Sequence, residues 1–127
     1  MLISPLDIVA QAKTVISECS VSDVAQCLNA ATLVIDVREP AELGKGRIRG
    51  AVHVPRGLLE FEIHKLVDEA RGGTNTPGHE YPIVVCCRTN GRSALAAQSL
   101  QSMGYKNVKS MAGGMAAWTA ANLPVER

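Results

Sequence analysis

The fold of this chain is decided by the stretch Pro82-Ile83-Val84-Val85-Cys86-Cys87-Arg88-Thr89-Asn90-Gly91-Arg92. Its first part, Pro82 to Cys86, is a short apolar run of the kind found in strands that are covered on both faces. From Ala94 to Met103 the apolar residues recur at helical spacing, and Gly104 then supplies a residue that commonly ends helices. The sequence therefore predicts a strand, a short loop and a helix in succession around Cys87.

The same alternation of strand and helix patterns continues on both sides of this unit. Further extended segments are predicted at Ile16 to Cys19, Thr32 to Val37, Ala51 to Val54 and Asn107 to Met111. Helices are predicted at Pro5 to Ile16 behind Ser4, at Val21 to Leu28 behind Ser20, at Leu58 to Val67, and after Gly113-Gly114 around Trp118, with an irregular stretch from Arg71 to Tyr81. This order predicts an α/β fold with a mostly parallel sheet and helices on both faces.

Composition and charge narrow the class of protein. A length of 127 residues with 46% hydrophobic and 20% charged residues predicts one globular domain over residues 1–127, with the helical segments of residues 1–30 packed on the same core. The net charge of +1, without a basic block, predicts neither a nucleic-acid nor a membrane partner. No secretory leader or bilayer-spanning run is evident, so a cytoplasmic location is expected, with the four cysteines reduced.

The position of Cys87 predicts a reactive sulfur. Ligands of parallel α/β proteins bind beyond the carboxyl ends of the strands, where loops lead into helices. Asn90 and Gly91 tolerate unusual backbone angles, so the loop can aim its N–H groups at an anion, and the next helix adds its positive dipole end. Arg88 and Arg92 add cationic neighbours that favour a thiolate. Such an anion cradle suits sulfur or phosphate transfer, whereas an isolated cysteine at a strand end is more often a small buried hydrophobe.

Three motifs follow one another along the chain: Asp36 to Pro40 with Gly46 to Pro55, then Val84 to Ser93, then Gly104-Tyr105 with Gly113 to Trp118. In this order they resemble the first signature, the active-site loop and the last signature of the rhodanese family. The resemblance implies a rhodanese-like α/β fold with a central, mostly parallel five-stranded sheet. It covers most of the chain from about Thr32 onward.

The resemblance also implies an activity and a set of site residues. Cys87 would take sulfane sulfur from a donor such as thiosulfate, hold it as a persulfide, and pass it to cyanide in an assay or to a thiol or protein acceptor in the cell. Backbone N–H groups of the loop would stabilise that sulfur, while the arginine side chains would attract an anionic donor; the loop residues are Arg88, Thr89, Asn90, Gly91 and Arg92. Asp36 and Ser93 are expected to support the loop. No cofactor and no metal are expected.

Two alternative functions stay open. Related tyrosine phosphatases and arsenate reductases place their arginine one residue farther from the cysteine, so the shorter spacing from Cys87 to Arg92 favours sulfur over phosphate. A non-catalytic interaction module is the other alternative, although such domains typically lose the nucleophile. The chain also departs from the family pattern in the order Asn90-Gly91, in Arg47 where many members have histidine, and in Cys86.

Several further residues have plainer interpretations. Cys86 could act as a resolving thiol, but alternation along the strand predicts that it points into the core. Arg38 and Arg56 are expected to be solvated arginines near the pocket mouth, and Trp118 a packing residue. Asp36 could accept N–H bonds from the active loop or cap the turn at Glu39-Pro40-Ala41. The histidines and the cysteine pair show no zinc-ligand spacing.

Overall fold

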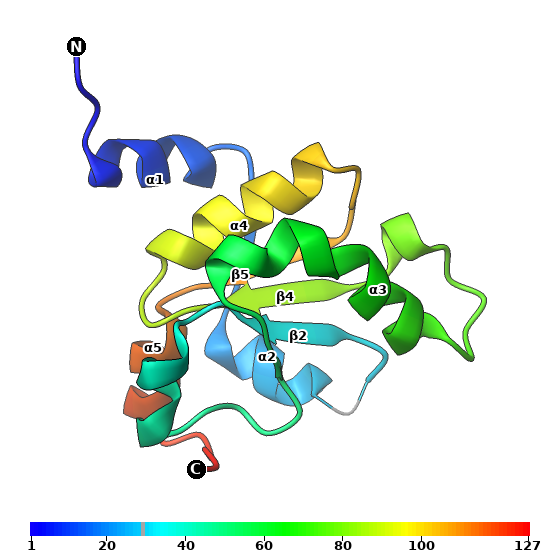
Figure 1. Ribbon diagram of the computed structural model, residues 1–127. Helices are drawn as coiled ribbons and strands as arrows, with labels where there is room; N and C mark the ends of the chain where they lie inside the picture. Colours follow the sequence, from blue (N-terminus) through cyan, green and yellow to red (C-terminus); the bar gives the residue numbers. More distant parts are fainter. Residues whose placement is uncertain (29) are drawn as a thin grey trace.

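A five-stranded parallel sheet forms the centre of the molecule (Figure 1). The structure is a computed structural model that describes residues 1–28 and 30–127. The strand order is β1-β5-β4-β2-β3, and every strand pairing is parallel, which confirms the predicted sheet. The strands are β1 (Ser17–Cys19), β2 (Leu33–Asp36), β3 (Val52–His53), β4 (Ile83–Cys86) and β5 (Val108–Met111).

Helices cover both faces of this sheet, as predicted. In Figure 1, α3 and α4 lie on one face and α2 and α5 on the other, and α1 packs on the outer side of α4. Three short 3₁₀ segments, Pro40–Lys45, Arg56–Leu58 and Gly78–Glu80, lie in the connections. The helices are α1 (Pro5–Lys13), α2 (Val21–Cys27), α3 (Leu59–Arg71), α4 (Gly91–Ser102) and α5 (Gly114–Ala120).

The sheet separates two hydrophobic layers, and alternate residues of β2 and β4 point into opposite layers. From β4 and the position after it, Ile83, Val85 and Cys87 join the layer under α3 and α4. Val84 and Cys86 join the layer formed with α2 and α5. The two adjacent cysteines therefore face opposite sides of the sheet, as the strand pattern predicts.

Three predicted helix boundaries differ from the structure by three residues or more. Helix α1 ends at Lys13, with Thr14 as its cap, so it stops before Ile16. Helix α3 extends to Arg71. Its buried stripe is regular, but Phe61 is 86% exposed on the outer side and blurs the hydrophobic period in the sequence. Helix α4 begins at Gly91 rather than at Ala94, because the polar end of the loop already forms its first turn.

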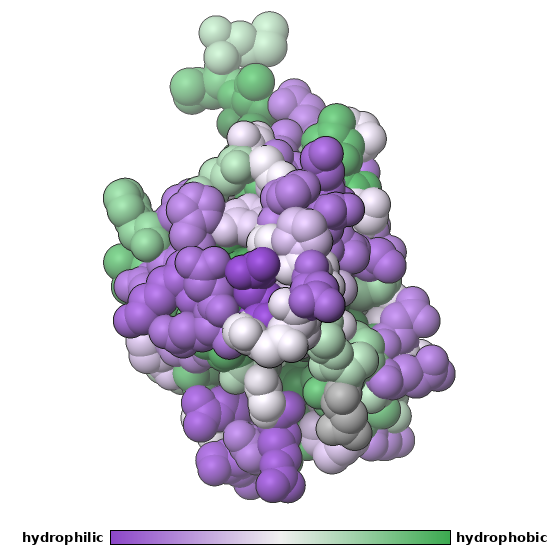
Figure 2. Space-filling view, turned by 90° about the vertical axis from the view of Figure 1, so that its right-hand side faces the viewer, coloured by the Kyte–Doolittle hydropathy of each residue, from purple (hydrophilic) through white to green (hydrophobic). Residues whose placement is uncertain are grey.

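Exposed hydrophobic side chains gather at the N-terminal end of the chain, which projects beyond the sheet (Figures 1 and 2). They are Met1, Leu2, Ile3 and Leu6. The rest of the face seen in Figure 2 is mostly hydrophilic. None of the helices in the described part of the chain has the length and apolarity needed to cross a bilayer.

Candidate active site

Cys87 follows β4 directly and lies beneath the loop that leads into α4. Its side chain is 1% exposed, while Arg88 and Thr89 are exposed above it. The Sγ atom accepts a hydrogen bond from the backbone N–H of Ser93 at 3.4 Å, and its thiol donates to the Ser93 hydroxyl oxygen at 3.4 Å. The first turn of α4 thus brings a backbone donor and a hydroxyl to the sulfur at the positive end of the helix. Ser93, expected to support the loop, contacts Cys87 itself.

A chain of polar side chains, buried at Ser93 and Ser110, fixes this loop to the sheet. The Ser93 hydroxyl accepts a 2.9 Å hydrogen bond from Ser110 of β5, and Ser110 also lies 3.0 Å from Asn90 Oδ1. Asn90 Nδ2 donates at 2.7 Å to Glu18 Oε2 on β1. The order Asn90-Gly91, a departure from the family pattern, therefore places an amide where it bonds to two strands. Sequence reasoning missed Ser110, whose only signal is a serine within a strand-like segment.

The loop is held from its other side by α5. The backbone N–H groups of Met115 and Ala116 donate to the carbonyl oxygens of Cys87 and Arg88 at 2.8 and 2.9 Å. Gly114 has a φ of +58°, and a Cβ at this position would lie 2.4 Å from the Thr89 oxygen. Only glycine allows α5 to approach the loop this closely. The glycine pair of the last motif thus contributes directly to the shape of the active-site loop.

Arg92 is engaged in an ion pair across the site. Its two terminal nitrogens contact the carboxylate oxygens of Glu42 at 2.5 and 2.9 Å. The hydrogen bonds from Arg92 lower the pKa of Glu42 to about 2, so the carboxylate is charged at neutral pH. The charge of Arg92 is therefore balanced by a neighbour. Glu42 lies fifty residues away from Arg92 in the chain, and its role had no local signal in the sequence.

Asp36 holds Arg38 rather than the active loop. Its carboxylate accepts bonds from the Arg38 guanidinium at 2.8 to 3.1 Å and from the Arg38 backbone N–H at 3.1 Å. Arg38 in turn donates to the carbonyl oxygens of Glu42 and Gly46 at 3.2 and 3.0 Å. The expectation of a solvated Arg38 is wrong, because the residue is 5% exposed. Arg56 is half-buried and forms an ion pair with Glu60.

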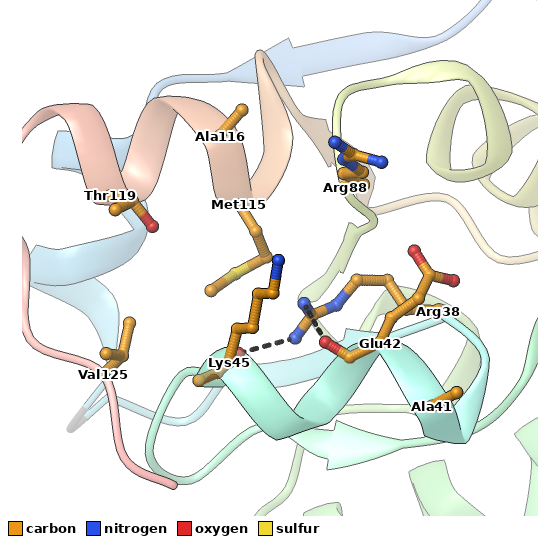
Figure 3. A pocket seen from close by; sticks show the side chains of 10 residues that line it. Arg38, Ala41, Glu42, Lys45, Arg88, Met115, Ala116, Thr119 and Val125 are labelled. Atoms are coloured by element: carbon orange, nitrogen blue, oxygen red, sulfur yellow. Dashed lines mark hydrogen bonds between the residues drawn. The ribbon is translucent and has the colours of Figure 1, made fainter.

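A cavity of about 550 Å³ lies against the loop that follows Cys87 (Figure 3). It runs between the 3₁₀ segment Pro40–Lys45 and the start of α5. The C-terminal segment closes one side, since Trp118 Nε1 donates to the Pro124 oxygen at 2.9 Å and Val125 lines the wall. Trp118 is fully buried, as predicted. The lining residues comprise charged side chains of both signs, a hydroxyl and apolar side chains, among them Arg38, Glu42, Lys45, Arg88, Met115, Thr119 and Val125.

Cys86 lies on the far side of the sheet from this site. Its side chain is fully buried in the layer formed with α2 and α5, which confirms the core interpretation. Burial raises the pKa of the Cys86 thiol, so the group stays protonated at neutral pH. Within residues 1–28 and 30–127, no group of three or more histidine, cysteine or carboxylate side chains is placed to hold a metal ion.

The family profile described as "Rhodanese-like domain" matches residues 20–121, which is most of the chain. This chain belongs to the rhodanese-like domain family. "Thiosulfate sulfurtransferase 16, chloroplastic" of Arabidopsis thaliana is 32% identical over 120 residues, which span 92% of this rhodanese and 98% of the plant protein. The family membership accords with the motifs around Cys87 and with the order of the elements.

Solved structures of similar proteins share this rhodanese fold. The polysulfide-sulfur transferase homodimer from Wolinella succinogenes is 32% identical, with a TM-score of 0.72 over 93% of this chain and 83% of that one. A Rhodopseudomonas palustris protein of unknown function, described as a possible tyrosine phosphatase, is 28% identical, with a TM-score of 0.81 over 99% and 96% of the two chains. Of these two similar structures, one is thus described as a sulfur transferase and the other as a possible phosphatase.

Proposed function

We propose that this rhodanese is a sulfurtransferase in which Cys87 carries the sulfur as a persulfide. The observation that carries the proposal is the position of Sγ beneath the loop, where it accepts a hydrogen bond from the Ser93 backbone N–H and contacts the Ser93 hydroxyl oxygen, both at 3.4 Å. Donors aimed at a sulfur anion stabilise the nucleophile before attack and the persulfide afterwards. The sulfurtransferase names of relatives that match most of the chain support the same class of reaction.

The first half-reaction transfers sulfur from a donor such as thiosulfate. The Cys87 thiolate attacks the outer sulfur of the donor, a new S–S bond forms, and the old S–S bond breaks as sulfite leaves with its electron pair. Arg88 is the active-loop arginine to which we assign attraction of the anionic donor, because the charge of Arg92 is balanced by Glu42. The N-terminal end of α4 adds a positive potential at the same place.

The second half-reaction returns Cys87 to its thiolate form. A thiophilic acceptor, which is cyanide in an assay and a thiol or a protein in the cell, attacks the outer sulfur and displaces the Cys87 thiolate. No cofactor enters either half-reaction. We further propose that the reaction takes place in the cytoplasm without a nucleic-acid or membrane partner, on the grounds of the near-neutral charge of +1 and the absence of a bilayer-spanning helix among the described residues.

The proposal is tested by weighing the intact protein after incubation with thiosulfate. Wild type should gain one sulfur atom, and Cys87→Ser should gain none. Cys27→Ser is the matched control, since it removes a thiol from α2 outside the active loop, and it should load like wild type. A wild-type protein that gains no sulfur under conditions in which a control rhodanese does would contradict the proposal.

Hydrolysis of an aryl phosphate is the second candidate function. It is favoured by one observation, the description of the Rhodopseudomonas palustris neighbour as a possible tyrosine phosphatase. The loop from Cys87 to Arg92 is one residue shorter than the phosphatase loop, and Arg92 turns to Glu42, so fewer groups face a tetrahedral phosphate. Turnover of an aryl phosphate faster than transfer of sulfur to cyanide would establish this alternative.

A further inference from the structure

Four polar side chains, Glu18, Asn90, Ser110 and Ser93, connect the exposed edge of the sheet to the Cys87 sulfur, and we call them the polar relay. Glu18 of the edge strand β1 and Ser110 of β5 are paired in the sheet, so their side chains point to the same face. Asn90 contacts both, since its Nδ2 donates to Glu18 at 2.7 Å and its Oδ1 accepts from Ser110 at 3.0 Å. The fully buried Ser110 reaches Ser93 at 2.9 Å, and Ser93 contacts Cys87.

Glu18 fixes which end of the Asn90 side chain faces the interior. A carboxylate has only acceptors, so it binds the NH₂ end of the amide and turns the carbonyl end inward. There Oδ1 faces two hydroxyls, that of Ser110 at 3.0 Å and that of Ser93 at 3.4 Å. The reverse orientation would place donors against both hydroxyls and occupy their oxygen atoms. The observed orientation leaves the Ser93 oxygen free to accept from the thiol or from Ser110.

Each serine hydroxyl has one hydrogen and more than one acceptor within reach. The Ser110 hydroxyl can donate either to Asn90 Oδ1 or to Ser93 Oγ. The Ser93 hydroxyl lies 3.2 Å from the backbone oxygen of Asn90 and 3.4 Å from the Cys87 sulfur. The hydrogens can therefore be arranged in two ways without movement of a heavier atom, and the ionisation of Cys87 decides between them.

In the thiol state Cys87 donates to Ser93 Oγ, so the Ser93 hydroxyl donates to the backbone oxygen of Asn90. Loss of the thiol proton to water leaves a sulfur anion that can only accept. The Ser93 hydroxyl then turns to the sulfur, and the Ser110 hydroxyl takes the place of the thiol as donor to Ser93 Oγ. A hydroxyl that itself accepts a hydrogen bond is a stronger donor. The hydroxyl groups rotate, and no proton passes from one residue to another.

We propose that Glu18, Asn90 and Ser110 are positioning residues that direct the Ser93 hydroxyl at the ionised sulfur of Cys87. This inference rests on the proposed function, because it concerns the nucleophile that takes up sulfur. The described residues that line the cavity beside the loop do not include these three, so we expect an effect on reactivity rather than on donor binding. The common rhodanese order, with glycine before asparagine, has no side chain at the position of Asn90, so the polar relay is a feature of this chain.

Single-turnover rates of persulfide formation over a range of thiosulfate concentrations test the role of Ser110. In Ser110→Ala the rate constant at saturating thiosulfate should fall by about two- to fivefold, within the scale of one hydrogen bond to a charged group, and the half-saturating concentration should not change. In the background of Ser93→Ala the same substitution should have little effect, because the hydroxyl through which Ser110 acts is gone. Losses that multiply in the double variant, or a higher half-saturating concentration alone, would overturn the role of Ser110.

Glu18 allows a second test at an exposed position, where substitution does not disturb the core. Glu18→Gln and Glu18→Ala have the same net charge, but only glutamine keeps an oxygen that can accept from Asn90. The saturating rate constant of Glu18→Ala should be about two- to threefold below that of Glu18→Gln. Ser17→Ala is the matched control, because Ser17 is exposed on the same strand and points to the opposite face, and it should react like wild type. Equal rates in Glu18→Gln and Glu18→Ala would overturn the role of Glu18.

Alkylation with iodoacetamide separates this inference from the proposed function, since it measures the reactivity of Cys87 without a sulfur donor. Peptide mass spectrometry resolves Cys87 from the half-buried Cys27. Ser110→Ala and Glu18→Ala should slow alkylation of Cys87 by the same factors as persulfide formation and leave that of Cys27 unchanged. Slower alkylation of Cys87 in a protein that gains no sulfur would refute the proposed function and leave the polar relay. Wild-type rates of both loading and alkylation in the two variants would overturn the polar relay alone.

Discussion

Cys86 and Cys87 are neighbours in the chain and are equally buried, with side chains 0% and 1% exposed, yet they lie in different environments. Cys86 enters an apolar layer, where burial raises its pKa. Cys87 lies at the end of the other layer, where its sulfur accepts a hydrogen bond from the Ser93 backbone N–H and donates one to the Ser93 hydroxyl. Burial alone therefore does not distinguish a structural thiol from a candidate nucleophile. The polar contacts of the sulfur make that distinction.

The largest expected effect comes from removing each thiol separately. Cys87→Ala should lower sulfur transfer to cyanide by about 10³-fold or more, the scale seen when a covalent nucleophile is lost. Cys86→Ala should keep most of the activity but lose about 1–2 kcal/mol of stability, because it leaves a small void in a packed layer. Rate assays and urea unfolding measure the two effects. Comparable activities for the two variants would remove the distinction between the cysteines.

The next largest effect tests how the loop above Cys87 is shaped. Gly114→Ala should destabilise the protein by about 2–5 kcal/mol, from the left-handed backbone angle together with the clash with Thr89 and Cys87 backbone oxygens. Gly44→Ala is its control, since a Cβ there meets nothing within 4 Å, and it should change stability by less than about 1 kcal/mol. Thermal unfolding compares the stabilities of the two variants. Similar melting temperatures would show that α5 does not constrain the loop.

A smaller effect is expected from the hydroxyl beside the sulfur. Ser93→Ala keeps the backbone N–H and removes the hydroxyl, which accepts from the thiol and can turn to donate to the thiolate, so the rate of persulfide formation should fall by about three- to tenfold. Ser102→Ala, on the exposed side of the same helix, should leave the rate unchanged. Stopped-flow measurements with thiosulfate give both rates. A wild-type rate in Ser93→Ala would leave the backbone donor as the sole distinguishing contact of Cys87.

The parts of this site that could be predicted from the sequence are those whose residues lie close together in the chain. The β4–loop–α4 unit and the opposite orientations of Cys86 and Cys87 follow from local periodicity, which acts over a few residues. The pairing of Arg92 with Glu42 and the contact of Ser93 with Ser110 cross fifty and seventeen positions. They depend on strand order and on the path of the 3₁₀ segment, which no local pattern encodes.

Contacts between distant parts of the chain also explain why two arginines with the same predicted role differ in the structure. Arg88 and Arg92 both flank the loop, and the sequence assigns both to anion attraction. Only Arg88 lines the cavity, because Glu42 reaches Arg92 from another part of the chain. Arg38 was predicted to be solvated for a similar reason, since the sequence did not show that Asp36 would bind its guanidinium inside the fold.

The smallest expected effect concerns the acid range. The pKa of Glu42 is lowered from about 4.5 to about 2, first by the hydrogen bonds from Arg92. A carboxyl with a depressed folded pKa stabilises the protein above its unfolded pKa, and this contribution is lost as the pH falls from about 4.5 to about 2. The stability difference between wild type and Glu42→Gln should therefore be present at neutral pH, at no more than about 1 kcal/mol, and shrink in acid. Urea unfolding at several pH values measures it, and a difference independent of pH would contradict the ion pair.

The proposal that Cys87 and not Cys86 carries the sulfur can be tested by locating that sulfur in the wild-type protein. After incubation with thiosulfate and alkylation, the peptide that contains both cysteines can be fragmented between them in a mass spectrometer. We expect an alkylated persulfide on Cys87 and a single sulfur atom on Cys86. Extra sulfur on Cys86, or sulfur divided equally between the two residues, would contradict it.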